Sequence, residues 1–423
     1  MRARQATYTY LIHRPLGSLG GPRPCLQRHF LVHTRASMTT STISLKTFLA
    51  AAKDALAMPP AQRSLPLTFV VGNESADLDS LCSAVVLAYI RSHIAPRRLH
   101  IPLSNLPRED LAMRIELGPI LAKADLDDSD LITLSELPQD LDPKDTDRVI
   151  SCIDHHVDEG AVSVQAAPRV IETCGSCMSL VVDTYADAWR ILAHGEQSPV
   201  TTKNISKDLN QLAQVALAPI LIDTVNMTAT AKIRPKDSRA AKLLEEELMH
   251  GPNFDQTAYF DIITAAKEDL SQLSLRDILR KDYKEWENGG IKLGISCVVQ
   301  NFDFFLEKAA STSKESGEDV MLRALHSWAQ EQKLDIASIM TTSNPGGEFQ
   351  RHLLVWGLTG GGKKAVKKFR EDTTEKLKLE LWNDGILDEP GSRHAWRQLA
   401  LDSSRKQVAP MLRDAMKWAS ANL

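Results

Sequence analysis

Residues 67–90 read LTFVVGNESADLDSLCSAVVLAYI. The apolar run at 67–72 has the length of a buried strand, and the residues after it include the Gly, Asn and Asp typical of a turn. The second apolar run, from Ser80 to His93, is long enough for a helix. A strand, a short polar turn and a helix begin a βαβ unit, and ligands of α/β sheets bind at the carboxyl end of such strands. The stretch therefore predicts an α/β domain with polar site residues at 73–79.

The alternation of strands and helices continues along the chain, which predicts a mainly parallel sheet flanked by helices. A smaller α/β domain begins near Ala258, after turn-forming segments at 233–237 and 251–256. The expected parts are a leader (1–40), an N-terminal domain (41–235), a linker (236–257) and a C-terminal domain (258–423). The main expected elements are strands at 67–72, 131–134, 149–153, 162–171, 291–299, 336–341 and 352–358, and helices at 43–57, 80–93, 176–188, 211–222 and 363–371.

The composition is that of a globular protein. The chain has 423 residues, of which 43% are hydrophobic and 25% charged, and this length allows two or three domains. Its net charge of −4 predicts no bulk attraction to nucleic acid or to a membrane, so an anionic ligand needs a local basic site. The six scattered cysteines indicate a reducing compartment. No apolar stretch approaches the roughly 18 residues of a membrane span.

The N-terminus has a composition of its own. The first 53 residues contain no Asp or Glu, and six arginines lie between Arg2 and Arg35. This composition is typical of a mitochondrial transit peptide. The alternative is a leader with no such role, with Met38 as a second start and the protein in the cytoplasm. In both cases residues 1–40 are left out of the fold prediction.

Three clusters of acids and histidines end apolar runs: Asp77 with Asp79, then Asp154-His155-His156, then Asp223. Taken singly, each is explained by a helix cap or a surface loop. Taken together, they gather at one edge of the predicted sheet. Carboxylate oxygens and imidazole nitrogens suit Mg²⁺ or Mn²⁺. Converging carboxylates repel one another, and two divalent ions roughly 3.5–4 Å apart would remove that repulsion and serve phosphoryl chemistry.

The motifs as a set resemble the DHH phosphoesterase superfamily, and the second half resembles its DHHA2 subgroup. That subgroup contains family II inorganic pyrophosphatases, exopolyphosphatases and prune-like proteins. The resemblance spans about residues 43–423 and implies an N-terminal catalytic domain with a smaller C-terminal DHHA2 domain that closes over the cleft. It rests on Asn73…Asp77-x-Asp79, Asp154-His155-His156, Ile222-Asp223-Thr224, Asp282-Tyr283-Lys284 and Ser404-Arg405-Lys406.

The resemblance also implies roles for single residues. The implied ligands of a two-metal centre are Asn73, Asp77, Asp79, His155 and Asp223. Asp154 is expected to orient His155 or to assist metal binding, and His156 to face the phosphate as a polar or acid group. The cations Lys284, Arg405 and Lys406 are expected to neutralise phosphate oxygens, although without the family they would be taken for ordinary surface residues.

One implied ligand departs from the family pattern. The family has a metal-bridging Asp at the end of a strand, where this chain reads LITLSE at 131–136. Glu136 is the nearest carboxylate and is assigned to the metal site in its place. Thr133 or Ser135 is the alternative in a strict alignment, and the metal centre would then be weaker.

Asn73 occupies a position at which family II pyrophosphatases have His, and in this it resembles the fungal exopolyphosphatases. An amide oxygen is a harder ligand than an imidazole nitrogen, which favours Mg²⁺ over softer metals. The expected function is therefore an exopolyphosphatase that releases orthophosphate from the ends of inorganic polyphosphate. The alternatives are a family II inorganic pyrophosphatase and a prune-like binding protein with weak phosphoesterase activity.

Three other patterns resemble known binding motifs. Cys174-Gly175-Ser176-Cys177 has no second CxxC pair and no nearby His, so zinc is not expected, and it resembles the family's Gly-Ser-Cys helix start. The run GLTGGGKK at 357–364 differs from a P-loop at one position, because Lys364 replaces the required Ser or Thr. The helix that follows carries Lys364, Lys367 and Lys368 on one face, either as a solvated face or as a track for long polyphosphate chains.

Overall fold

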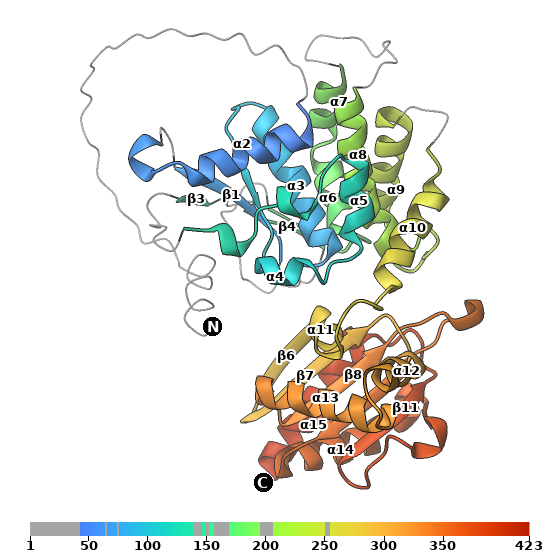
Figure 1. The fold of residues 1–423 in the computed structure, drawn as a ribbon. Coiled ribbons are helices and arrows are strands. Elements are labelled where there is room, and N and C mark those ends of the chain that lie inside the picture. The colour runs from blue at the N-terminus through green and yellow to red at the C-terminus, as the bar shows by residue number, and fades with distance from the viewer. Residues whose placement is uncertain are drawn as a thin grey trace. The chain divides into compact units, whose positions relative to one another are not determined.

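A computed structural model describes residues 43–63, 66–73, 76–138, 146–148, 152–155, 169–194, 206–249 and 254–422 of the chain. These residues form two compact units (Figure 1). Unit 1 falls within residues 1–112 and 116–264, and unit 2 comprises residues 113–115 and 265–423. The leader predicted at 1–40 lies outside the described residues. Among the helices of the described residues, none combines the length and the apolar character that crossing a membrane requires.

Unit 1 contains short parallel strands. β1 pairs with β2 and β3, and β4 pairs with β5, each in the parallel sense that βαβ connections produce. The strands are β1 (Leu67–Val71), β2 (Ile101–Leu103), β3 (Thr146–Arg148), β4 (Cys152–Asp154) and β5 (Arg169–Ile171).

The strand predicted at 131–134 is absent. Thr133 forms an isolated parallel bridge with Ser104, and a 3₁₀ helix begins at the next residue. The cause is local, because the Thr133 side chain and Glu136 cap this turn reciprocally. This helix is η3 (Leu134–Glu136), and the other 3₁₀ helices of the described residues are η1 (Pro60–Gln62), η2 (Asp128–Asp130), η6 (Pro345–Gly347) and η7 (Asn383–Gly385).

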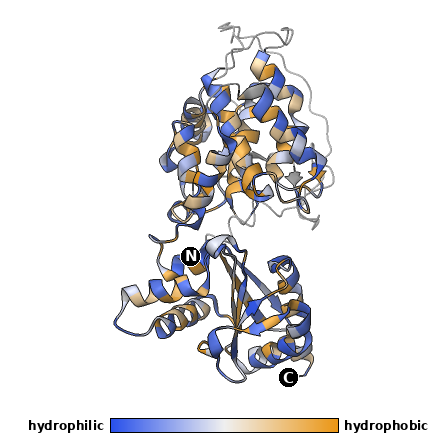
Figure 2. Cartoon of the chain, turned by 90° about the vertical axis from the view of Figure 1, so that its right-hand side faces the viewer, coloured by the Kyte–Doolittle hydropathy of each residue, from blue (hydrophilic) through white to orange (hydrophobic). Residues whose placement is uncertain are grey.

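Helices α3 and α8 form the centre of unit 1. Residues 78–90 of α3 are all buried, and so are 12 of the 18 residues of α8, so the core of this unit is mainly helical. Figure 2 shows the apolar residues of unit 1 concentrated on its central helices. The helices are α2 (Leu45–Ala57), α3 (Leu78–His93), α4 (Arg108–Leu111), α5 (Leu117–Lys123), α6 (Cys177–Thr184), α7 (Ala186–His194) and α8 (Lys207–Thr224).

The linker predicted at 236–257 is instead largely helical and belongs to unit 1. It contains most of α9 (Pro235–Lys242), the π-helix η5 (Leu243–Leu248) and the start of α10 (Gln256–Glu268). Pro235 is the first residue of α9, where a missing N–H has no cost, and Asp237 caps the helix through the Arg234 N–H. The Pro and Asp that suggested a linker are therefore signals of a helix start.

Unit 2 is built on a six-stranded sheet of order β10-β11-β9-β8-β7-β6 (Figure 1). β7 and β8 are parallel and the other pairs are antiparallel, so the largest described sheet of the chain is mixed. Gly289 and Gly290 connect β6 to β7 with positive φ, as a tight hairpin requires. The strands are β6 (Tyr283–Asn288), β7 (Ile291–Val298), β8 (Ile336–Thr341), β9 (His352–Gly357), β10 (Leu379–Leu381) and β11 (Arg393–Gln398).

Helices cover both faces of this sheet. Residues of α14 and α15 share one core cluster with Ile295 and Leu353, and residues of α11 to α13 share a second cluster with Ile339 and Leu354. The two clusters thus alternate along β9, as side chains of a strand do. The helices are α11 (Leu275–Lys281), α12 (Phe302–Thr312), α13 (Gly317–Gln332), α14 (Gly360–Leu377) and α15 (Arg405–Ala421).

Candidate metal centre

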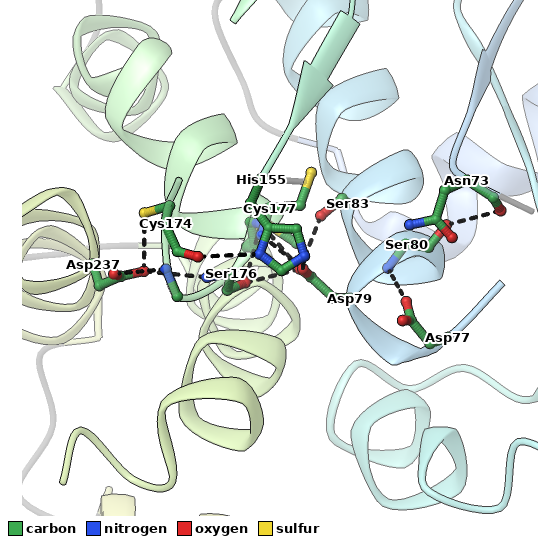
Figure 3. A network of polar contacts seen from close by, with 12 residues as sticks. Asn73, Asp77, Asp79, Ser80, Ser83, His155, Cys174, Ser176, Cys177 and Asp237 are labelled. Carbon is green, nitrogen blue, oxygen red and sulfur yellow. Dashed lines mark hydrogen bonds and ion pairs between the residues drawn. The ribbon is translucent and has the colours of Figure 1, made fainter. Parts of the chain in front are cut away.

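Asp79 lies in the first turn of α3 and is only 5% exposed, so its carboxylate needs polar partners inside the protein. Its Oδ1 accepts from the Ser176 Oγ at 2.8 Å and from the Met178 N–H at 3.0 Å. Its Oδ2 accepts from the Cys177 N–H at 2.7 Å. These donors belong to the first turn of α6 (Figure 3). The N–H groups of a helix start have no partner within the helix, so their bonds to the Asp79 carboxylate fix its position.

His155 follows β4 and faces Asp79 (Figure 3). Its Nδ1 lies 3.3 Å from the Cys174 carbonyl oxygen. A carbonyl only accepts, so Nδ1 is the donor in this contact and Nε2 is the ring nitrogen directed toward Asp79. Nε2 lies 3.8 Å from the Asp79 Oδ2, which is too long for a hydrogen bond. A cation between these two atoms would contact both.

Asp237 holds the segment that connects these two side chains. It is fully buried; its Oδ2 accepts from the Gly175 N–H at 2.9 Å and its Oδ1 from the Ser176 N–H at 3.3 Å. Burial raises the pKa of Asp237, but hydrogen bonds from the Cys174 thiol and from the backbone N–H groups of Arg234 and Gly175 outweigh it and hold the pKa below its usual value. Sequence reasoning missed this residue, although Pro235 followed by an acid is a helix-start signal.

Gly175 allows a close approach that brings the Asp223-Thr224 motif to the same place. A Cβ on Gly175 would lie 2.8 Å from the Thr224 side chain and 2.9 Å from the Asp237 carboxylate oxygens. The close packing expected of the Gly-Ser-Cys helix start is therefore present. Asp223 is half-buried in the last turn of α8, directly before Thr224. The end of α8 thus lies against the segment that contacts Asp79 and His155.

Asn73 and Asp77 lie in the turn before α3. The Asn73 carbonyl accepts from the Ala76 N–H at 3.2 Å, and Ala76 has a φ of 43°, so the turn is tight. Asp77 is exposed and caps α3 by accepting from the Ser80 N–H at 3.0 Å. Figure 3 shows Asn73 and Asp77 around Ser80, whereas Asp79 reaches His155. The cap role is thus established for Asp77, and metal ligation by Asn73 and Asp77 stays a prediction.

Glu136 has partners outside this cluster. Its Oε2 accepts from the Thr133 N–H at 2.6 Å, and its carboxylate pairs with Arg108 at 2.8 Å. Burial raises the pKa of Glu136, but the bonds from Arg108 and Thr133 outweigh it and leave the pKa lowered. Within the described chain, no contact joins Glu136 to Asp79 or His155. The expected bridging carboxylate is thus engaged in capping η3.

The remaining predicted residues of unit 1 are only partly described. β4 ends at Asp154, directly before His155, and His156 lies outside the described residues. The roles given to Asp154 and His156 stay predictions. Among the described residues, no group of three or more His, Cys, Asp or Glu side chains is arranged to hold a metal ion. The candidate centre is therefore the Asp79–His155 pair, with Asp237 and the end of α8 behind it.

In unit 2 the structure joins two of the predicted motifs. Arg405, the first residue of α15, donates from Nη1 to the Asp282 carbonyl at 2.9 Å and from Nη2 to the Asp282 carboxylate at 2.7 Å. Lys284 lies two residues further, on β6, and Lys406 is exposed in the first turn of α15. The three predicted phosphate-binding cations thus occupy one corner of unit 2.

Comparison with known proteins matches residues 261–415 to the family model described as the DHHA2 domain. A Schizosaccharomyces pombe protein named "Putative exopolyphosphatase" is 30% identical over 375 residues, which is 84% of this chain and 92% of that protein. The human protein named "Exopolyphosphatase PRUNE1" is 27% identical over 378 residues, or 84% of this chain and 77% of that protein. A manganese-dependent inorganic pyrophosphatase of Methanocaldococcus jannaschii is 25% identical over 236 residues, or 55% of this chain and 71% of that protein.

Proposed function

This chain belongs to the DHHA2 subgroup of the DHH phosphoesterases, and we propose that it is an exopolyphosphatase that hydrolyses the terminal phosphoanhydride bond of inorganic polyphosphate and releases orthophosphate. The observation that carries the proposal is the approach of the His155 Nε2 to the buried Asp79 carboxylate at 3.8 Å. This is one half of a cation site, placed where the ligand motifs of the family occur. The relatives named as exopolyphosphatases support the substrate.

The donor set fits a hard divalent cation. Asp79 offers a carboxylate oxygen and His155 a neutral imidazole nitrogen. The thiol of Cys174 is no competitor, because burial and its bond to Asp237 raise its pKa to about 12 and keep it protonated. We infer Mg²⁺ or Mn²⁺, held by Asp79 and His155 together with Asn73, Asp77 and Asp223. Glu136 joins this set only if it leaves Arg108. When bound, the cation supplies Lewis acidity and lowers the pKa of a coordinated water.

The chain's own residues have separate tasks. The Cys174 carbonyl is proposed to orient the His155 ring through Nδ1, so that Nε2 is directed toward Asp79 and the metal. Asp154 is proposed to support His155, and His156 to contact the phosphate. Lys284, Arg405 and Lys406 are proposed to bind phosphate oxygens, because charge-assisted hydrogen bonds to an oxyanion are the strong ones.

Asn73 is proposed to affect which metal the site prefers and, through its difference from the pyrophosphatases, which substrate it takes. Its amide oxygen is a harder ligand than the imidazole expected in a family II pyrophosphatase, so Mg²⁺ is the proposed preference. One observation favours an alternative function. Because the Glu136 carboxylate is engaged with Arg108 and Thr133, the bridging position lacks its expected ligand, as suits a prune-like binding protein with weak phosphoesterase activity.

The test is orthophosphate release from long polyphosphate, tripolyphosphate and pyrophosphate, with Mg²⁺, with Mn²⁺ and with EDTA. We expect release from the two longer substrates, abolished by EDTA. A preference for pyrophosphate would assign the chain to the pyrophosphatases, and polyphosphate binding without turnover would favour the prune-like alternative. Titration of Mn²⁺ by electron paramagnetic resonance, with wild type and Asp79→Asn, tests the metal site independently of turnover.

A further inference from the structure

One face of the unit 2 sheet gathers basic side chains from distant parts of the chain. Lys284 pairs directly with Ile295, so both side chains lie on the face covered by α15. Cys297 is two residues beyond Ile295 and points to the same face. Arg351 is two residues before Leu353, which also packs in the α15 cluster, and its carbonyl accepts from β11 at 2.9 Å. Lys284, Cys297 and Arg351 therefore share this face.

The start of α15 meets these residues. The Cys297 N–H donates to the Asp282 carbonyl at 2.9 Å, and Arg405 binds both the carbonyl and the carboxylate of Asp282. The Arg351 Nε donates to the Leu401 carbonyl at 2.7 Å, in the segment that leads into α15. We call Lys284, Cys297, Arg351 and Arg405 the cationic corner.

The pKa of the Cys297 thiol is affected by all three cations, which shows that they lie near it. Burial raises its pKa to about 12, and Arg405, Arg351 and Lys284 all act to lower it. Two carboxylates face the cations: Asp282 acts on Cys297, and Asp402 acts on Arg351. The corner thus holds three cations against two acids and keeps a positive charge.

Arg351 differs from Arg405 in how its charge is compensated. Arg405 has a carboxylate partner, whereas Arg351 has no ion pair within the described chain. Its Nε bonds the Leu401 carbonyl, and its guanidinium lies 5.0 Å from the centre of the Phe349 ring, which leaves the Nη groups without a described acceptor. Burial lowers the pKa of Arg351. A half-buried guanidinium without a direct ion pair is costly, and its planar fork fits phosphate oxygens.

We propose that Arg351 is a further substrate-binding residue, whose Nη groups bind a phosphate of the polyphosphate chain beyond the phosphate held at Lys284 and Arg405. The inference rests on the proposed function. β6 and β9 are separated by two strands, which is about 14 Å across the sheet, and Arg351 lies four residues before Val355, the β9 residue level with Lys284, which is about 13 Å along the strand. The backbones of Lys284 and Arg351 are therefore about 19 Å apart. A run of phosphates fits this separation better than pyrophosphate does, so Arg351 favours substrates of three or more phosphates.

The test compares Arg351→Gln with a matched control, Arg397→Gln, in the full chain. Arg397 lies on the adjacent strand β11, opposite His352 and therefore on the other face of the sheet, and it pairs with Glu380 at 3.1 Å. The measurements are KM and kcat with Mg²⁺ for tripolyphosphate and pyrophosphate, and the Kd of tripolyphosphate by calorimetry in EDTA.

For Arg351→Gln we expect KM and Kd for tripolyphosphate to rise ten- to a hundredfold, as the loss of a charge-assisted bond implies. We expect KM for pyrophosphate to rise less than about threefold, and the Arg397→Gln control to leave all values unchanged. Arg351→Lys should recover part of the affinity because it keeps the charge. An unchanged melting temperature in Arg351→Gln excludes a merely structural effect.

The outcomes separate this inference from the proposed function. If wild type hydrolyses polyphosphate and Arg351→Gln leaves the tripolyphosphate KM unchanged, the role of Arg351 is refuted and the proposed function stands. If wild type binds tripolyphosphate through Arg351 but hydrolyses nothing, the proposed function fails and the site stands. If wild type neither hydrolyses nor binds these anions, both fail.

Discussion

Asp237 in unit 1 is a buried charge and Arg351 in unit 2 a half-buried charge of opposite sign, and their surroundings differ. The Asp237 carboxylate accepts hydrogen bonds from the backbone N–H groups of Gly175, Ser176 and Arg234, so its charge is compensated within the protein. The Arg351 guanidinium has one described hydrogen bond and no ion pair within the described chain. A compensated charge fixes the geometry of its neighbours, whereas an uncompensated one is suited to bind a charged ligand. The first arrangement suits metal ligands that must be held in place, and the second suits a phosphate.

The largest expected effect tests the fixed side of this comparison. Asp79→Asn removes the ligand charge and places an NH₂ group among the N–H donors of α6. We expect polyphosphate hydrolysis to fall by more than about a hundredfold, since even residues behind the ligands are worth 10–100-fold, and Mn²⁺ binding to weaken with it. The matched control is Asp187→Asn, whose carboxylate is 97% exposed. An unchanged rate at saturating Mg²⁺ would remove Asp79 from the metal site.

Asp237→Asn should have the next largest effect, because it loosens the segment that positions Asp79 and His155 without touching either. We expect a 10–100-fold loss of Mn²⁺ affinity and a free energy of unfolding lowered by about 1–3 kcal/mol. Metal titration and urea unfolding measure the two effects separately. If the free energy of unfolding falls while the metal affinity is unchanged, Asp237 only caps the helix and does not position the metal ligands.

The lowered pKa of Asp237 adds a pH dependence with a definite sign. The folded state binds this proton less readily than the unfolded chain does, so the stabilisation is complete above the usual carboxyl value of 3.8 and is lost as pH falls through the lower folded pKa. The difference in unfolding free energy between wild type and Asp237→Asn should therefore shrink below about pH 4. A difference that is constant from pH 6 to pH 3 would mean that the charge of Asp237 does not stabilise the fold.

Glu136 decides whether unit 1 has a second carboxylate for the metal centre. If it stays with Arg108, then Glu136→Gln and Arg108→Gln should have the same small effect, about 0.2–1 kcal/mol of stability and less than a threefold change in rate. If Glu136 moves to bridge the metals, Glu136→Gln alone should reduce the rate by tenfold or more. Parallel measurements of turnover and urea unfolding on the two variants distinguish these cases.

The parts that the sequence predicts well are those with local signals. β1, the turn and α3 follow from one continuous stretch, and the strand expected at 336–341 has those bounds in the structure. One wrongly predicted strand, at 131–134, and one unexpected strand, β6, also had local signals. Thr133 and Glu136 have the Thr-x-x-Glu spacing of a capping box, and Gly289-Gly290 marks a hairpin. Each of these signals consists of only two residues, whereas an apolar run extends over four or more.

Other residues could not be found from the sequence. The main partners of Asp237 lie some 60 positions earlier in the chain, and no periodicity links such distant positions. The role of Arg351 depends on which face of the sheet it occupies, and that face follows from the pairing of β7, β8 and β9. Motifs identify residues that a family shares, whereas compensation of buried charge becomes visible only once the chain is folded.

The smallest expected effect concerns three lysines, two of which already have partners. Lys364, Lys367 and Lys368 lie on α14, where the sequence suggested a track for long polyphosphate. In the structure Lys368 pairs with Asp372 at 2.9 Å and lies over the Trp418 ring, and Lys364 donates to the Asn422 carbonyl at 3.1 Å. A cation whose charge already has a partner in the protein, as that of Arg405 does, gains less from binding a phosphate than one without an ion pair among the described residues, such as Arg351. We therefore expect these lysines to contribute little to substrate binding.

We therefore expect replacement of these three lysines by Ala to raise KM for long polyphosphate by less than about twofold. The free energy of unfolding should fall by about 0.5–1 kcal/mol through the lost contacts with Trp418 and Asp372. The measurement compares long polyphosphate with tripolyphosphate at low and high salt. A tenfold rise in KM for long chains only, which shrinks at high salt as screening predicts, would show that exposed cations bind substrate despite their partners. Compensation would then matter only for buried charges, and the contrast between Arg351 and Arg405 would have to rest on burial alone.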